Sequence, residues 1–320
     1  MSAPAIAVVI IGRNEGQRLI ACLASLAGQN AQIVYVDSGS DDGSQEAARK
    51  AGAHVIDLDT TTAFTAARAR NAGAEYLAAQ EQPPEFVQFV DGDCALDPNW
   101  LAQAQAFLSE TPKAAVVFGR RRERFPEASI YNQMIDREWD VPVGQVSSCG
   151  GDALMRFSAF RAVGGYRPDL IAGEEPELCV RLRAAGWTIW RIAAEMTLHD
   201  AALTRFSQWW QRNRRAGHAY AEGAAIHGAP PERHGVRETR SALVWGPGLL
   251  LAAIFGAALS PWLSVVFLAW PVQVLRLLKR GEGWPRAAFL VLGKFPEAQG
   301  VLDFWWNRLK GQRRGLIEYK

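Results

Sequence analysis

The first half of the chain alternates short apolar runs with segments in which apolar residues recur at helical spacing. Ile6–Ile11 is a continuous apolar run, as expected for a parallel strand that is buried on both faces. In the segment that follows, Leu19, Cys22 and Leu26 would share one face of a helix. Further strands are predicted at residues 33–36, 54–58 and 86–90, and further helices at residues 44–51 and 66–79. Strands that alternate with helices indicate an α/β fold with a mostly parallel sheet.

The pattern changes after about residue 205. Residues 241–275 carry no charged side chain and are interrupted by Gly246-Pro247 and by further prolines. The run is too long for one membrane-spanning helix, which needs about 20 apolar residues, and slightly short for two with a turn. We predict two short membrane helices hinged near Ser260-Pro261, or a re-entrant hairpin. A buried helical pair in a soluble protein is the alternative.

Charge divides the chain in the same way, into a body (residues 1–240), a hydrophobic membrane hairpin (241–275) and a basic tail (276–320). The tail carries ten Lys and Arg against four Asp and Glu, a net +6, whereas the body sums to −4 and the whole chain to +2. Basic residues on both sides of the hairpin favour two cytoplasmic ends. We expect the tail to lie along the anionic lipid of a bacterial inner membrane, with Phe304-Trp305-Trp306 at the headgroups.

Composition excludes several classes of protein. Hydrophobic residues make up 49% of the chain and charged residues 21%, so a sizeable core is available and global disorder is excluded. A slightly acidic body is not suited to binding nucleic acid through its phosphates. The cysteines form no CxxC pair, so a disulfide framework or a zinc ribbon is not expected and a reducing compartment fits. The apolar run at the N-terminus has no basic flank, so it is interpreted as a strand and not as a signal peptide.

Carboxylates mark two points along the body. Asp91-Gly92-Asp93 follows a predicted strand, where two carboxylates can hold a hard divalent cation and leave positions for phosphate oxygens. Asp and Gly are also ordinary turn residues, so the motif alone carries little weight. Further on, Glu174-Glu175-Pro176 opens a predicted helix, with Pro176 at its first position and Glu175 near the cap. A carboxylate held there is a candidate general base, and the alternative is a side chain favoured only by the helix dipole.

The order of the motifs resembles a family-2 glycosyltransferase of the GT-A fold. The resemblance covers about residues 5–225 and rests on five segments: Ile10–Glu15, Val36–Gly43, Ala69–Gly73, Asp91–Asp93 and Glu174–Trp187. It implies an enzyme that transfers a sugar from a nucleotide-diphosphate donor with inversion of configuration. A divalent cation, Mg²⁺ or Mn²⁺, is the implied cofactor. Uridine is the base favoured in that family, so a UDP-sugar is the favoured donor.

The resemblance also implies roles for individual residues. Those implied to bind the donor are Asn14, Glu15, Asp37, Ser38, Arg70, Asp91 and Asp93. Those implied to bind the metal are Asp91, Asp93 and His199, although a lone histidine is often only structural. Glu175 matches the proposed catalytic base, with Glu174 and Asp152 as the residues to which that role would otherwise pass.

The acceptor side is less defined. Gly150-Gly151 is compact enough for a sugar hydroxyl to approach the backbone, and Trp209 with Arg212 resembles an acceptor- or membrane-proximal helix. We expect a lipid-linked or polysaccharide acceptor in cell-envelope or exopolysaccharide synthesis. The chain departs from the family at Ile11-Gly12, where many members have Pro and a small residue, and at Glu175, where Asp is commoner. A degenerate member that acts as a membrane scaffold is the alternative function.

Overall fold

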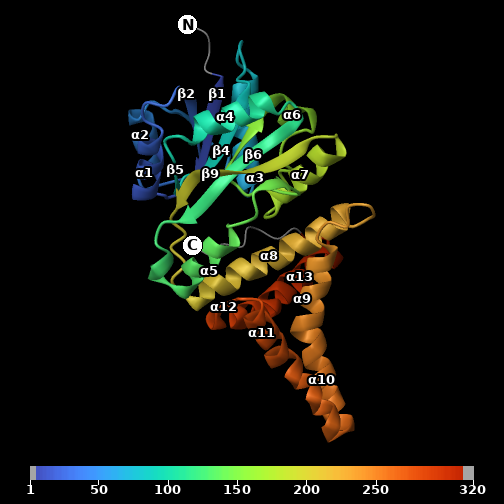
Figure 1. Ribbon diagram of the computed structural model, residues 1–320. Helices are drawn as coiled ribbons and strands as arrows, with labels where there is room; N and C mark the ends of the chain where they lie inside the picture. The colour runs from blue at the N-terminus through green and yellow to red at the C-terminus, as the bar shows by residue number, and fades with distance from the viewer. Residues whose placement is uncertain (1–4, 313–320) are drawn as a thin grey trace. The chain divides into compact units, whose positions relative to one another are not determined.

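The computed structural model describes residues 5–312, in two compact units that divide between Ala202 and Leu203 (Figure 1). The last part of the predicted basic tail, from residue 313, lies outside the described residues. Each unit has its own internal packing.

Within the described residues, the first unit is built on a nine-stranded sheet with helices packed around it (Figure 1). The strands are β1 (Ile6–Gly12), β2 (Ala31–Asp37), β3 (His54–Asp57), β4 (Phe86–Asp91), β5 (Cys94–Leu96), β6 (Ala114–Glu123), β7 (Gly144–Val146), β8 (Ala153–Arg156) and β9 (Thr188–His199). Their order across the sheet is β3-β2-β1-β4-β8-β6-β9-β5, and β7 pairs with β9.

The prediction of a mostly parallel sheet holds for one half only. β3, β2, β1 and β4 are parallel neighbours, as the alternating pattern indicated. Beyond them β8 runs antiparallel to both β4 and β6, and β5 and β7 run antiparallel to β9, so the sheet is mixed. β5 and β7 have only three residues each, which is too short for any periodicity to show in the sequence.

The helices of the first unit cover a core of buried apolar side chains. They are α1 (Gln17–Ser25), α2 (Ser44–Lys50), α3 (Ala66–Ala78), α4 (Trp100–Glu110), α5 (Ile130–Glu138), α6 (Phe157–Ala162) and α7 (Glu174–Ala184), with a short 3₁₀ turn at Pro126–Ala128. Ile6–Ile11 is buried throughout, which confirms a strand covered on both faces. The predicted face of α1 is confirmed as well, since Leu19, Cys22 and Leu26 are all buried.

The carboxyl ends of the parallel strands come together at one edge. Gly12 at the end of β1 lies beside Asp37 at the end of β2, and Ile11 lies beside Asp91 at the end of β4. In open α/β sheets ligands bind outside this edge. The register therefore gathers the polar loops that the sequence placed after each strand.

The second unit is helical. Its elements are α8 (Phe206–His227), α9 (Val236–Leu243), a π-helical turn η2 (Val244–Gly248), α10 (Leu249–Leu259), a 3₁₀ segment η3 (Pro261–Leu268), α11 (Ala269–Lys279), α12 (Trp284–Leu292) and α13 (Lys294–Leu309). α8 and α13 pack closely because glycines lie at their crossing. A side chain on Gly217 would meet the carbonyl oxygen of Glu297 at 1.9 Å, and one on Gly300 would meet that of Arg214 at the same distance.

Residues 236–279 form a helical hairpin that turns at Ser260, where the sequence predicted a hinge (Figure 1). Among the described residues, the two arms Val236–Leu259 and Pro261–Lys279 are long and apolar enough to cross a membrane, by length and composition only. Their side chains are mostly exposed: Phe255 is 65%, Leu259 84% and Trp262 88% accessible. The alternative of a buried helical pair is therefore wrong for this unit.

Candidate active site

The loop after β2 is organised by the carboxylate of Asp37, which is 1% exposed. One oxygen accepts hydrogen bonds from the Tyr35 hydroxyl (2.8 Å) and the Ser40 hydroxyl (2.6 Å). The other accepts from the backbone amides of Gly39 and Ser40 and from the Gln45 amide. Burial alone would raise the pKa of Asp37, but these hydrogen bonds outweigh it and lower the pKa. Asp37 thus shapes the loop that carries Ser38.

Asn14 joins the loop after β1 to the loop after β2. Its side-chain oxygen accepts a hydrogen bond from the backbone amide of Asp41 at 2.9 Å, and its backbone amide donates to the Ser40 hydroxyl at 2.9 Å. Its φ of 54° is in the left-handed region, which Asn tolerates better than most residues. The neighbouring Glu15 forms an ion pair with Arg18 at 2.9 Å. The structure therefore brings the predicted donor residues of both loops together.

Arg70 on α3 is the centre of a buried ionic group, here called the Arg70 cluster (Arg70, Asp91, Glu174 and Glu175). Its guanidinium is 2% exposed and donates to Glu175 at 2.8 Å, to Glu174 at 2.9 Å and to Asp91 at 2.9 Å. Burial would lower the pKa of Arg70, but the carboxylates, Glu175 first, outweigh it and raise the pKa. Arg70, predicted to bind the donor, is thus engaged by three acidic side chains.

One arginine cannot neutralise three carboxylates, and Glu175 shows the consequence. Burial and the nearby charge of Glu174 raise the pKa of Glu175 to about 7, against the opposing effect of Arg70. A carboxylate with a pKa close to neutral is well matched to accepting a proton at physiological pH. Perturbed groups of this kind cluster at functional sites.

α7 begins two residues earlier than the sequence indicated. Its cap is Gly173, with φ 79°, and the amide of Glu177 donates to the Gly173 carbonyl at 3.1 Å. Glu174 is therefore the first helical residue and Pro176 the third, which corrects the prediction that Pro176 opens the helix. Both glutamates lie in the first turn, where the helix dipole favours negative charge.

The backbone at Gly151 packs closely against the Arg70 cluster. A side chain at this position would lie 2.6 Å from an Arg70 nitrogen, 3.2 Å from an Asp91 oxygen and 3.2 Å from Glu175 Oε1. Gly150 is exposed, and a Cβ atom there would have no neighbour within 4 Å. The predicted acceptor loop therefore passes directly beside the predicted base, and only glycine permits that approach.

Asp91 and Asp152 share a second cation that the sequence did not indicate. Arg121 on β6 lies 3.5 Å from an Asp91 oxygen and 3.6 Å from an Asp152 oxygen, and its guanidinium stacks over Trp139 at 4.7 Å. Asp152 is 1% exposed, and its oxygens accept from the Thr197 hydroxyl at 2.8 Å and from the Asp91 amide at 3.1 Å. These contacts position Asp152 beside Asp91.

Asp93 lies on the other side of the Gly92 turn, next to His199. The pairing of Cys94 with His199 on β5 and β9 brings His199 Nε2 to 3.2 Å from the Asp93 carboxylate. Burial, and then the charge of Arg121, lower the pKa of His199, so the imidazole is neutral at physiological pH. Its Nδ1 lies 3.5 Å from the carboxylate of Glu123, the nearest acidic group on that side of the ring.

The side chains around Asp93 and His199 include ligand atoms that fit a divalent cation. Among the described residues, one potential metal group comprises Asp93, Cys94 and His199, and another comprises Asp91, Cys94 and Asp152, with the ligand atoms of each within 4.8 Å of one another. Carboxylate oxygens suit Mg²⁺ or Mn²⁺, and the neutral imidazole favours the transition metal Mn²⁺ over Mg²⁺. The thiol of Cys94 is a poor ligand for either, because burial raises its pKa. Asp93 and His199 are therefore the residues that would hold the cation.

The sequence alone could have drawn attention to the charged residues at the end of β6. Arg120, Arg121 and Arg122 follow directly after a buried apolar run, and charged side chains at that point of a strand are exceptional. Glu123 then completes the strand. What could not be found is the register that places Arg121 and Glu123 beside β9.

The predicted acceptor residues of α8 belong to the second unit. Trp209 is 2% exposed and packs edge-on against Phe289, with ring centroids 5.0 Å apart. An acceptor has no access to a ring so placed, so Trp209 packs the helices together. Arg212 is half-buried on the same helix.

Three comparisons with known proteins bear on this site. The family model described as "Glycosyl transferase family 2" matches residues 7–164. ExoA, the succinoglycan biosynthesis protein of Rhizobium meliloti (strain 1021), is 26% identical over 220 residues, which are 64% of this chain and 66% of ExoA. The glycosyltransferase AglE of Haloferax volcanii is 24% identical over 199 residues, 58% of this chain and 64% of AglE. The chain thus matches just under two thirds of the length of each curated relative.

Among solved structures, the mannosyltransferase PcManGT from Pyrobaculum calidifontis, in complex with GDP-Man and Mn²⁺, is similar with a TM-score of 0.64. The similarity covers 96% of this chain and 89% of that protein at 17% sequence identity. At that identity the similarity establishes the fold. The GT-A fold predicted from the sequence is confirmed.

Proposed function

The chain belongs to glycosyl transferase family 2, and from that premise we propose that it is an inverting, metal-dependent and membrane-associated enzyme. It transfers a sugar from a nucleotide-diphosphate donor to a lipid-linked or polysaccharide acceptor in cell-envelope or exopolysaccharide synthesis. The name of ExoA, a succinoglycan biosynthesis protein, supports the last part. The observation that carries the proposal is Glu175, a carboxylate with a pKa of about 7 beside the Arg70–Asp91 ion pair.

Glu175 is the proposed general base. Arg70 holds Glu175 Oε1 at 2.8 Å, which orients the carboxylate and leaves Oε2 to take the proton of the acceptor hydroxyl. The neighbouring Gly150 is exposed and has open space around it, which leaves room for that hydroxyl to approach from the side of this loop. The deprotonated oxygen then attacks the anomeric carbon as the bond to the nucleoside diphosphate breaks, so configuration inverts. Glu174 and Asp152 remain the residues to which this role would pass.

The donor lies along the strand ends. The loops that carry Asn14, Glu15, Asp37 and Ser38 are proposed to enclose the base, a uridine in the favoured case. A divalent cation held by Asp93 and His199, with Asp91 nearby, would stabilise the negative charge on the leaving diphosphate. Arg121 lies 3.5 Å from Asp91 and 3.6 Å from Asp152, so it offsets part of the negative charge on that side of the site.

The hairpin is proposed to insert into the inner membrane with the catalytic unit on its cytoplasmic face. The uncharged part of the first arm, residues 241–259, is about 28 Å long at 1.5 Å per residue. A hydrocarbon core is about 30 Å thick, so the arm is close to the length of a full span. The exposed apolar side chains of both arms support insertion, because no described residue covers them. Residues 1–240, 241–275 and 276–320 are thus proposed as the catalytic, hairpin and juxtamembrane parts.

A thermal-shift panel tests the donor. The purified chain is heated with UDP-, GDP- and dTDP-sugars, each with and without Mn²⁺. A true donor at about 100 times its Kd stabilises the fold by about 2.7 kcal/mol, and only with the cation. Turnover of that donor would then separate an enzyme from a scaffold. A chain that no nucleotide sugar stabilises and that turns none over would refute the proposed function.

A further inference from the structure

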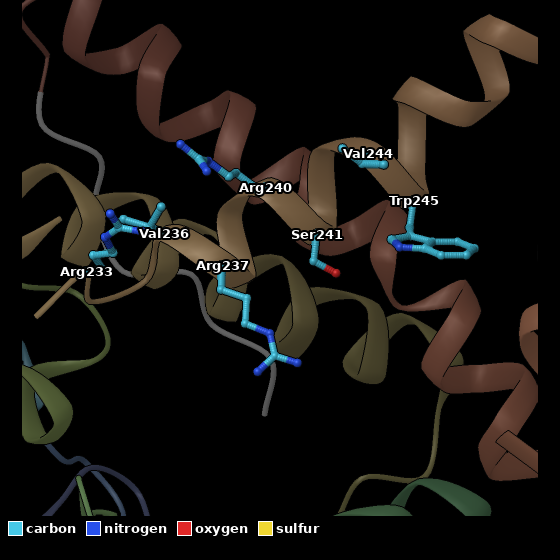
Figure 2. Close-up of a pocket in the computed structure, with 7 residues that line it drawn as sticks. All are labelled: Arg233, Val236, Arg237, Arg240, Ser241, Val244 and Trp245. Carbon is cyan, nitrogen blue, oxygen red and sulfur yellow. The ribbon is translucent and has the colours of Figure 1, made fainter. Parts of the chain in front are cut away.

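A groove of about 400 Å³ lies at the beginning of the hairpin (Figure 2). It is lined by Arg233, Val236, Arg237, Arg240, Ser241, Val244 and Trp245. All seven residues come from the loop before α9, from α9 itself and from η2. The predicted active-site residues of the first unit contribute nothing to it.

The helical spacing explains why these residues form a groove. Arg237, Ser241 and Trp245 recur every four residues and form one ridge of the helix, as Figure 2 shows. Val236, Arg240 and Val244 form the adjacent ridge with the same spacing, and a groove runs between two such ridges. The opposite face of the helix is occupied, because Gly246 is buried close to the Lys294 carbonyl oxygen of α13.

One end of the groove is strongly cationic. Arg233, Arg237 and Arg240 are exposed, and the described part of the chain offers no carboxylate in an ion pair with any of them. Other arginines of the same unit are paired, as Arg214 is with Asp303 at 2.6 Å. Guanidinium groups bind phosphate oxygens in a bidentate manner, and the Ser241 hydroxyl adds a further donor.

The other end of the groove is apolar. Val244 is 52% exposed, and the ring of Trp245 lines the groove one residue further on. Tryptophan at this position is typical of the boundary between headgroups and acyl chains. From here the first arm continues as the exposed apolar helix α10. The groove therefore changes from cationic to apolar in the direction of the predicted membrane.

We propose that this groove binds the headgroup of an anionic phospholipid. The phosphate lies at the end of the groove that Arg233, Arg237 and Arg240 border, and the first part of the acyl chains runs past Val244 and Trp245. Charge complementarity favours a headgroup with a net negative charge over a zwitterionic headgroup such as that of phosphatidylcholine. The apolar end of the groove favours a lipid over a free anion. The site would fix the depth and rotation of the hairpin.

The inference rests on the proposed membrane association of residues 241–275. The two ideas fail differently. Wild-type chain that fractionates as a soluble protein in the absence of detergent would contradict the membrane association. A membrane-bound chain whose groove does not distinguish lipid headgroups would contradict only the groove assignment.

The test uses the full chain in a neutral detergent. It is titrated calorimetrically with soluble short-chain phosphatidylglycerol, with phosphatidylcholine of the same chain length and with inorganic phosphate. We expect phosphatidylglycerol to bind at least tenfold more tightly than either of the others. The triple variant Arg233→Gln, Arg237→Gln, Arg240→Gln should lose at least tenfold in that affinity. Because all three side chains are exposed, the substitutions should leave the fold and the donor-induced thermal shift unchanged.

A variant that conserves charge distinguishes a specific headgroup site from diffuse electrostatic attraction to anionic lipid. Arg233→Lys, Arg237→Lys, Arg240→Lys keeps every charge but loses the bidentate contacts, so affinity should fall severalfold. Lysine and wild-type chains of equal affinity would show only diffuse attraction and overturn the proposal. Equal binding of both lipids would overturn it too. Inorganic phosphate that binds as tightly as phosphatidylglycerol would assign the groove to a free anion instead.

Discussion

Arg70 is the residue whose replacement most directly tests the reasoning about the acidic site. Arg70→Ala leaves Asp91, Glu174 and Glu175 together without their common cation. Removing one partner of a buried ion pair costs about 3–5 kcal/mol, because the remaining charge stays desolvated. Total stability is only about 5–15 kcal/mol. We expect this loss in the free energy of unfolding, measured by urea denaturation at pH 8.

The same substitution should change how activity depends on pH. In the wild-type chain activity should rise with pH through about 7, as Glu175 loses its proton and becomes able to accept one. Arg70 favours the charged form, so its removal raises the pKa of Glu175 further. The attraction between charges about 4 Å apart is about 4 kcal/mol at an effective dielectric constant of 20, and about 1.4 kcal/mol already moves the profile by one pH unit.

Arg70→Lys is the matched control. It keeps the positive charge but cannot reach Glu174, Glu175 and Asp91 in the same fixed geometry. We expect it to keep the wild-type pH profile more closely than Arg70→Ala, while it lowers turnover. A profile of Arg70→Ala that still rises near pH 7, in a folded variant, would show that Arg70 does not control the ionisation of Glu175.

Three further substitutions and one labelling experiment test the remaining assignments. Glu175→Gln should lower kcat by about 100-fold or more while donor affinity is retained, and Glu174→Gln is its comparison; near-normal turnover of Glu175→Gln would move the base elsewhere. Asp93→Asn should abolish the part of the donor-induced thermal shift that needs Mn²⁺, whereas the exposed Glu110→Gln should leave it intact. Gly151→Ala should impair turnover by at least tenfold, because the new methyl group would lie 3.2 Å from Glu175 Oε1; unimpaired turnover would mean that no close approach occurs there. A single cysteine introduced at Gly281 should be labelled only from the cytoplasm, and labelling from the outside would refute the topology.

The parallel half of the sheet and the loops at its edge could be predicted because each strand is an apolar run that ends abruptly. Asp37 and Asp91 are the last residues of β2 and β4, so the sequence alone located them. The antiparallel half depends on pairings between distant segments, and a three-residue strand such as β5 has no pattern of its own. The contact between His199 and Asp93 is a product of that pairing.

Side-chain partners were the less predictable part of the site. Asp91 and Asp93 form one acidic pair in the sequence, yet the turn at Gly92 directs Asp91 toward Arg70 and Asp93 toward His199. For Trp209, the pattern of residues in the sequence is ambiguous. Aromatic and basic residues mixed along a helix are typical both of a binding surface and of packing between helices, and only burial distinguishes the two.

The distribution of charge in the Arg70 cluster explains how neighbouring carboxylates can do different work. Asp91 is flanked by two cations, Arg70 and Arg121, an arrangement that suits a carboxylate proposed to lie near a metal and a diphosphate. Among the described residues, Glu175 forms an ion pair only with Arg70, which also pairs with Glu174, and burial together with the charge of Glu174 raises the pKa of Glu175 to about 7. Pairs of acids whose environments push their pKa values apart are how one site combines charge stabilisation with proton transfer. Arg121 pairs with Asp91 and, among the described residues, forms no ion pair with Glu175, which supports the proposed division of roles between the two carboxylates.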